Sequence, residues 1–150
     1  MRVVIQRVRS AEVAIAGATV AQIGPGLLVL VGFTDGDGPQ QLQWMARKLA
    51  GLRVFEDAEG KMNLAVAETD GALLLVPNFT LYADCSKGRR PGFSGAAQPD
   101  VASRLFDDFC ALMQGFGVPV EKGEFGAYMQ VNLQNDGPVT LIIDSPDPGS

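Results

Sequence analysis

The chain has 150 residues, of which 47% are hydrophobic and 19% charged, and its formal net charge is −5 at pH 7. This composition is typical of one globular domain with its own core, and it excludes a basic footprint for nucleic acid over the whole surface. No apolar run reaches the roughly 18 residues of a membrane helix, and the N-terminus lacks a signal-peptide pattern, so we expect a cytoplasmic protein with no membrane partner.

The sequence contains no histidine. This excludes Ser-His-Asp and Cys-His catalysis as well as His-ligated zinc. Cys85 and Cys110 lack the spacing of a metal site, and we expect both to be free thiols. No cluster of residues implies a metal or another cofactor. An enzyme with this sequence must therefore use carboxylates, Lys, Cys, Thr, backbone dipoles or groups of its substrate.

The first half of the chain alternates short strands with one helix. Strands are expected over 2–8, 12–15, 18–23 and 27–31, the middle two forming a hairpin. Pro39 fits the first turn of a helix. The apolar residues at helical spacing behind it are Leu42, Met45, Leu49 and Leu52. A short strand over 52–55 and a turn over 56–61 follow.

The stretch from residue 73 onward changes character twice. Residues 73–76 form an uninterrupted apolar run, which indicates a buried strand, and Pro77 and Asn78 interrupt it because proline has no N–H for a sheet. The densest basic cluster of the chain follows at Lys87, Arg89 and Arg90. A buried strand that ends beside positive charge can present backbone N–H groups to an anion. A core strand followed by a solvated loop explains the same pattern.

A second helix and two strands are expected in the remainder. The helix begins near Pro99, with an apolar stripe at Val101, Leu105, Phe109, Leu112 and Phe116. Strands over 129–134 and 139–143 flank a turn at 135–138. The element order predicts an α/β fold: a single domain over 1–143 with a largely antiparallel, barrel-like sheet and two main helices. Residues 144–150 are expected to form a flexible C-terminal tail.

Five short motifs, in order along residues 1–143, resemble the D-aminoacyl-tRNA deacylase family. They are Ile5-Gln6-Arg7-Val8, Gly26-Leu27-Leu28-Val29, Gly60-Lys61-Met62-Asn63-Leu64, Phe79-Thr80-Leu81 and Asn135-Asp136-Gly137-Pro138-Val139-Thr140. Each motif alone is weak, whereas their joint occurrence at these positions is specific. The resemblance covers essentially the whole predicted domain.

The resemblance implies a homodimeric hydrolase that acts on aminoacyl-tRNA. Its expected reaction is cleavage of the ester between a D-amino acid and tRNA, and also of glycine wrongly attached to alanine tRNA. In the family, a Gly-Pro pair with a cis peptide bond reaches across the dimer into the partner's active site and blocks L-amino acids. Gly137 and Pro138 match that pair.

The expected chemistry uses the backbone, because an aminoacyl ester is already reactive and chiefly needs orientation and charge stabilisation. The N–H groups of Phe79 and Thr80 are the candidate oxyanion donors. Water assisted by the 2′-hydroxyl of the terminal ribose is the expected attacking group, as the family's RNA-assisted mechanism suggests. The Thr80 hydroxyl is the lower-ranked alternative nucleophile, since no residue type for a general base stands beside it.

Two further sets of residues are expected to contact the substrate. Pro77 and Asn78 stand where family members usually carry Ser-Gln, so side-chain contacts of those positions with the terminal adenosine are in doubt. We expect activity to be retained with altered affinity. The candidate contacts with tRNA phosphate are Lys87, Arg89, Arg90 and Arg7.

Two rival interpretations remain open. The first is a hydrolase that uses Cys85, with its thiolate stabilised by the neighbouring basic cluster. The second is a non-catalytic dimeric RNA-binding module that grips phosphate and releases no amino acid.

Overall fold

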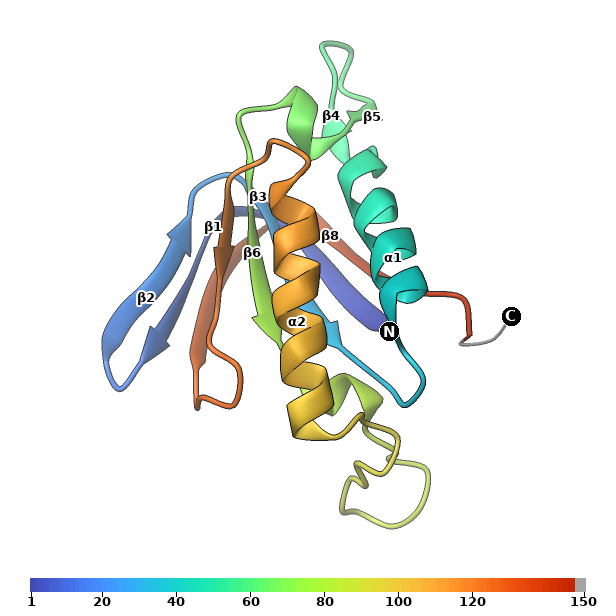
Figure 1. Cartoon of the computed structure of the whole chain (residues 1–150). Coiled ribbons are helices and arrows are strands. Elements are labelled where there is room, and N and C mark those ends of the chain that lie inside the picture. The colour runs from blue at the N-terminus through green and yellow to red at the C-terminus, as the bar shows by residue number, and fades with distance from the viewer. Residues whose placement is uncertain (148–150) are drawn as a thin grey trace.

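The computed structural model describes residues 1–147, and in it two α-helices lie on one face of a curved β-sheet (Figure 1). The helices are α1 (Pro39–Gly51) and α2 (Pro99–Gln114), and two short 3₁₀ turns are η1 (Val66–Glu68) and η2 (Phe79–Tyr82). The main sheet contains β1 (Arg2–Ile15), β2 (Ala18–Ile23), β3 (Gly26–Gly32), β6 (Ala72–Pro77), β7 (Val120–Lys122) and β8 (Gln130–Asp144). A separate two-stranded ladder joins β4 (Phe55–Glu56) to β5 (Met62–Leu64).

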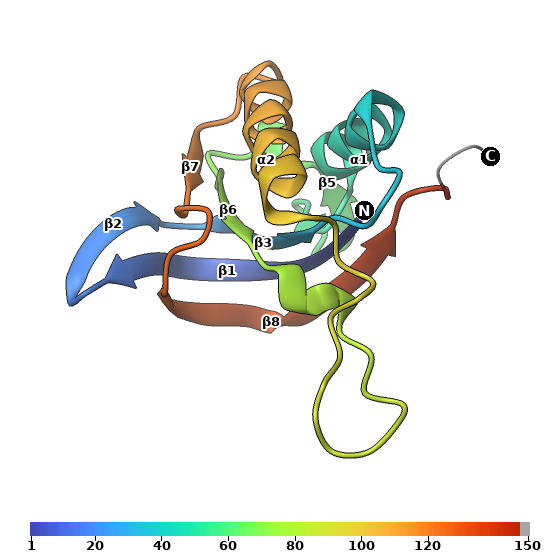
Figure 2. The same ribbon diagram turned by 60° about the horizontal axis from the view of Figure 1, so that its bottom comes forward.

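The sheet is organised around β1, which has neighbours on both edges. Its first half pairs with β3 and its second half with β2, while β8 runs antiparallel to it along almost its whole length (Figure 2). The strand order is β2-β1-β3-β6-β7, with β8 attached to β1 outside this path. This arrangement curls the sheet and confirms the predicted barrel-like α/β domain with two main helices. The sheet is mixed, because β6 pairs in parallel with both β3 and β7.

Three local predictions need correction. The predicted strands over 2–8 and 12–15 are one continuous strand, and the predicted turn at 135–138 lies inside β8. The short strand predicted over 52–55 begins only at Phe55. In the first two cases, pairing with β1 decides where the strands run. In the third, β4 pairs only with the nearby β5.

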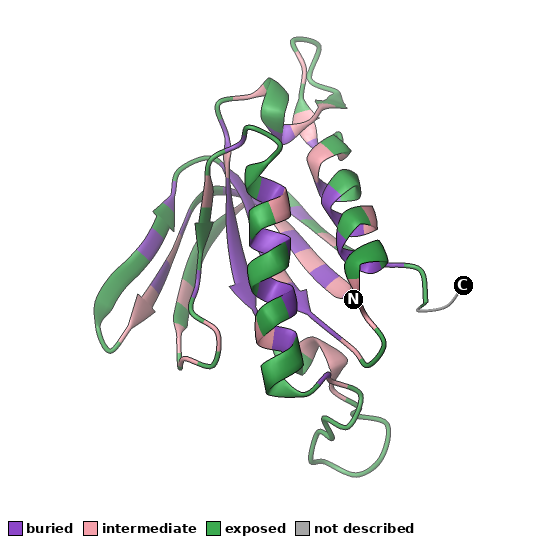
Figure 3. Cartoon of the chain, in the orientation of Figure 1, coloured by how far each residue is buried: buried purple, intermediate pink, exposed green. Residues whose placement is uncertain are grey.

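Buried residues gather on the central strands and along the two helices (Figure 3). They form two clusters, one on each face of the central strands. Between the sheet and the helices, Leu27 and Leu73 belong to a cluster with the buried residues of α1 and α2. On the other face, Leu28 and Leu74 pack with buried residues of β1 and β2. The α2 stripe was partly mispredicted: Val101 is 38% exposed and Phe116 40% exposed. Val101 lies in the first helical turn and Phe116 beyond the helix end at Gln114, so neither side chain reaches the sheet.

The last described residues belong to the domain. Asp144 ends β8 opposite Arg2, and the buried Ser145 hydroxyl accepts a 2.7 Å hydrogen bond from the Met1 ammonium. The predicted domain boundary at residue 143 is therefore early by at least these two residues. Residues 148–150 of the predicted tail lie outside the described part of the chain.

Candidate active site: a strand end and a hook

The first part of the site is the end of β6, where the chain leaves the sheet. Pro77 is buried, and the Asn78 N–H donates a 2.8 Å hydrogen bond to the Val31 carbonyl of β3. Asn78 then serves as the N-cap of η2, whose first residue is Phe79. The buried Pro77 ring is thus part of the scaffold, and only Asn78 of this predicted substrate-binding pair has a side chain at the surface of the site.

The two candidate oxyanion donors differ in their surroundings. Phe79 supplies the first amide of η2, which has no acceptor within its own helix. The Thr80 N–H donates to Asn78 Oδ1 at 3.2 Å, and the Thr80 hydroxyl donates to the same oxygen at 2.5 Å. Asn78 Oδ1 therefore already accepts hydrogen bonds from the second candidate donor, the Thr80 N–H, and from the Thr80 hydroxyl. The exposed ring of Phe79 meets Phe93 edge-on, with 5.1 Å between ring centroids.

Titratable groups near η2 are poor proton acceptors. Burial, together with the negative charge of Asp37, raises the pKa of Tyr82 well above its ordinary value. The exposed Asp84 carboxylate accepts hydrogen bonds from the Ser86 side chain and backbone, which lowers the pKa of Asp84. Neither the neutral phenol of Tyr82 nor the weakly basic carboxylate of Asp84 is a strong general base.

The second part of the site is an excursion within β8. Gln6 of β1 pairs with Thr140 and Val8 pairs with Asn135, so residues 136–139 together stand opposite Arg7 alone. We call residues 136–139 the hook. At its tip Gly137 and Pro138 are exposed, and the peptide bond between them is cis.

Arg7 holds the base of the hook and is only 8% exposed. Its Nε donates to the Asp136 carbonyl at 2.9 Å, and its Nη1 donates to the Val54 carbonyl at 2.7 Å. Because β8 leaves the ladder here, the guanidinium replaces the partner that a regular strand would supply. Arg7 was expected to contact tRNA phosphate, and in the structure two of its donors face protein carbonyls.

Replacing Arg7 by Met should lower the free energy of unfolding by about 2–3 kcal/mol, because two carbonyls lose a charged donor. Urea denaturation measures the change. Arg9→Met is the matched control: the Arg9 side chain is 72% exposed and lies 3.7 Å from an Asp136 oxygen. We expect a loss of at most about 0.5 kcal/mol there. Equal losses in both variants would contradict the assigned role of Arg7.

The hook and η2 of one chain lie at different places along β1. Arg2 donates to the Leu81 carbonyl of η2 at 3.0 Å, whereas Arg7 contacts the hook. The two arginines are five positions apart, which is about 17 Å along an extended strand.

The predicted basic residues gather on the loop between η2 and α2, which extends away from the body of the domain (Figure 2). Lys87, Arg89 and Arg90 are all exposed there. Backbone hydrogen bonds between Asp84 and Gly92, of 2.7 and 2.9 Å, close the base of this loop. The loop therefore carries three cations on a segment joined directly to the candidate oxyanion donors.

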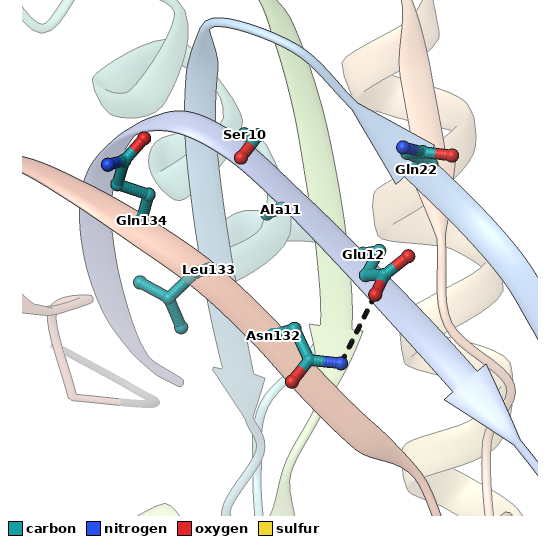
Figure 4. Close-up of a pocket in the computed structure, with 7 residues that line it drawn as sticks. All are labelled: Ser10, Ala11, Glu12, Gln22, Asn132, Leu133 and Gln134. Atoms are coloured by element: carbon teal, nitrogen blue, oxygen red, sulfur yellow. Dashed lines mark hydrogen bonds between the residues drawn. The ribbon is translucent and has the colours of Figure 1, made fainter. Parts of the chain in front are cut away.

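A separate cavity of about 460 Å³ lies on the surface of β1, β2 and β8 (Figure 4). Its lining residues are Ser10, Ala11, Glu12, Gln22, Asn132, Leu133 and Gln134. None of the predicted site residues lines it. The Glu12 carboxylate already accepts hydrogen bonds from Thr19 and Asn132 at 3.3 Å each.

Within residues 1–147, no group of three or more His, Cys, Asp or Glu side chains is arranged to hold a metal ion. The same residues include no helix with the length and apolar character needed to cross a bilayer. The fold defines a single-domain α/β protein, and its candidate site lies where β6 ends in η2.

Comparison with known proteins identifies the family. Residues 4–144 match the family described as D-Tyr-tRNA(Tyr) deacylase. The protein named D-aminoacyl-tRNA deacylase from Chlorobaculum parvum is 56% identical to this chain, and the alignment covers 97% of this chain and 99% of the relative. The protein of the same name from Thermosipho africanus is 50% identical, with 97% of each chain covered. The chain belongs to the D-Tyr-tRNA(Tyr) deacylase family, which confirms the resemblance seen in the sequence.

Two solved structures show the same fold. One titled c-Myc DNA Unwinding Element Binding Protein superposes with a TM-score of 0.92 at 38% identity, covering 98% of this chain and 100% of that one. One titled as a probable eukaryotic D-amino acid tRNA deacylase has the same fold, with a TM-score of 0.82 at 19% identity and coverage of 95% and 97%.

Proposed function

We propose that this protein hydrolyses the ester of D-aminoacyl-tRNA to free tRNA and D-amino acid, and so edits mischarged tRNA in the cytoplasm. The observation that carries the proposal is the family match over residues 4–144, which includes both η2 and the hook. The direct test is single-turnover release of amino acid from D-tyrosyl-tRNA and L-tyrosyl-tRNA. The D-ester should be cleaved and the L-ester left intact; equal cleavage of both would contradict the proposal.

The proposed chemistry takes place at the start of η2. The Phe79 N–H faces the developing oxyanion of the ester, and the Thr80 N–H joins it when the substrate oxygen replaces Asn78 Oδ1. A water molecule attacks, assisted by the 2′-hydroxyl of the terminal ribose. The scarcity of strong bases near η2 supports this route, because the substrate then supplies the group that the protein lacks.

We propose that the hook of a second copy of the chain distinguishes D- from L-aminoacyl esters. Within one chain, about 17 Å of β1 separates the hook from η2, so the tip cannot easily flank an ester held at the same chain's Phe79. The exposed surface of β8 supports a homodimer, since Ile142 is 69% exposed and Leu133 is 37% exposed. Main-chain atoms of Gly137 and Pro138 form a rigid wall against the L side chain.

The same proposal extends to glycine wrongly attached to alanine tRNA. If the wall acts only by excluding an L side chain, glycine has no side chain to exclude. Glycyl-tRNA should then be cleaved at a rate nearer to that of the D-ester than to that of the L-ester. Resistance equal to that of L-tyrosyl-tRNA would contradict selection by exclusion.

The basic loop is proposed to contact tRNA phosphates. Replacing Lys87, Arg89 and Arg90 together by Ala should flatten the slope of log kcat/KM against log salt by about 2, because each contact to single-stranded nucleic acid contributes about 0.7. Lys61→Ala, an exposed lysine in the β4–β5 turn, is the control and should leave the slope unchanged. An unchanged slope in the triple variant would remove these residues from the tRNA contact.

The cysteine alternative has a direct test. Cys85 is exposed beside the basic cluster, whereas Cys110 is buried, and burial raises the pKa of Cys110 to about 12. Cys85→Ala should keep the deacylation rate within about twofold of the wild type, because the chain has no histidine to take the proton of the thiol. Abolished release would favour the cysteine hydrolase. Binding of tRNA without release of amino acid would favour the RNA-binding module.

A further inference from the structure

The side chain of Asn135 bridges the two ends of the hook. Its Nδ2 lies 3.0 Å from the Val139 carbonyl, 3.1 Å from Thr140 Oγ1 and 3.2 Å from Gln6 Oε1. Its Oδ1 accepts a 2.8 Å hydrogen bond from the Val139 N–H. One amide group thus binds both backbone groups of Val139 and also reaches the neighbouring strand.

These contacts replace the ladder where β8 loses its register. In a regular antiparallel pair, a residue's N–H and carbonyl are satisfied by the opposite strand. Val139 has no partner on β1, because the register passes from Asn135 to Thr140, and the Asn135 amide takes over both roles. The hydrogen bonds between the Asn135 side chain and the Val139 backbone close a short loop, in which only residues 136–138 lie between the two bonded residues.

The opposite side of the hook is held by a different group. Arg7 donates to the Asp136 carbonyl, so the hook is fixed at its first residue by Arg7 and at its last by Asn135. Gly137 and Pro138 lie between these two anchors. A shift of Val139 must therefore displace the tip.

We propose that Asn135 is a positioning residue that sets the place of the Gly137-Pro138 tip and thereby the discrimination between D- and L-aminoacyl esters. The inference rests on the proposed function. Asn135 touches no reacting atom and acts through Val139. A wall displaced by about 1 Å no longer meets the L side chain, and misplacement of this size can change rates by about 10²-fold.

Asn135→Ala tests this role. It should lower the ratio of D- to L-tyrosyl-tRNA single-turnover rates by at least about tenfold, chiefly through faster cleavage of the L-ester. The matched control is Asn132→Ala, at another asparagine of β8. It removes a single 3.3 Å hydrogen bond to Glu12 of β1 and should leave the ratio unchanged. A purely structural role would lower the amount of folded protein and slow both esters equally, so the ratio separates the two.

Asn135→Asp provides a second variant of the same shape in case the alanine variant does not fold. It keeps the acceptor for the Val139 N–H but places an oxygen against the Val139 carbonyl, so the ratio should fall here also. A ratio within twofold of wild type in a folded variant overturns the inference and leaves the proposed function standing. Failure of the wild-type protein to release D-tyrosine overturns the proposed function and this inference with it.

Discussion

Deacylation of D-tyrosyl-tRNA should slow by about 10²–10⁴-fold when the terminal ribose lacks its 2′-hydroxyl and the amino acid is esterified to the 3′-oxygen. The expectation follows from the groups around η2. The phenol of Tyr82 stays protonated because burial raises its pKa, and the carboxylate of Asp84 is a weakened base because its pKa is lowered. The ribose hydroxyl is then the group best placed to assist the attacking water.

Thr80→Val provides the complementary measurement. Valine keeps the backbone N–H and the approximate shape, and removes only the hydroxyl that Asn78 Oδ1 accepts from. If the backbone stabilises the oxyanion, the rate should stay within about tenfold of wild type. A loss of several orders of magnitude, with the 2′-deoxy substrate cleaved normally, would instead make the Thr80 hydroxyl the nucleophile.

Gly137→Ala should remove most of the discrimination between D- and L-tyrosyl-tRNA. Gly137 has φ +147°, and an added Cβ would lie 2.7 Å from the backbone nitrogen of Val139 and 2.7 Å from its Cγ2. Because backbone atoms cannot rotate away, the hook itself must shift. We expect the D-ester to be cleaved about 10²-fold more slowly and cleavage of the L-ester to rise above its background.

Gly60→Ala controls for the backbone cost of that substitution. Gly60 also has a positive φ, of +78°, and an added Cβ there meets no atom within 4 Å. Its alanine variant should lose stability in urea, yet keep the D/L ratio of the wild type. A ratio preserved in Gly137→Ala would show that the hook is not the wall that reads handedness.

The sequence alone predicts the architecture well but not the long-range pairing. Apolar runs and helical spacing correctly indicate the central strands and both helices, because burial in the core sets those patterns. The continuity of β1 and the place of the hook inside β8 depend on partners more than 120 residues apart, as in the pairing of Val8 with Asn135. Turn-forming residues at 135–138 fit a hairpin turn and an internal excursion equally well.

For the candidate site too, the sequence predicts the location but not the contacts. The motif around Phe79 and Thr80 locates the end of β6, since the apolar run stops at a proline. The sequence does not reveal that Asn78 binds both the N–H and the hydroxyl of Thr80, although Asn is a preferred residue at the N-cap of a helix. In the sequence, nothing distinguishes Arg7 from a surface arginine of a strand. Its burial is explained only by the structure, in which residues 136–139 leave the ladder opposite Arg7.

The most direct test of the account is a crystal structure with a non-hydrolysable D-tyrosyl-3′-aminoadenosine bound. We expect the analogue's carbonyl oxygen to lie within about 2.7–3.1 Å of the Phe79 nitrogen, with residues 137 and 138 of a second copy packed beside the α-carbon. An analogue bound away from η2, or a bound α-carbon with no hook from another chain beside it, would contradict the account.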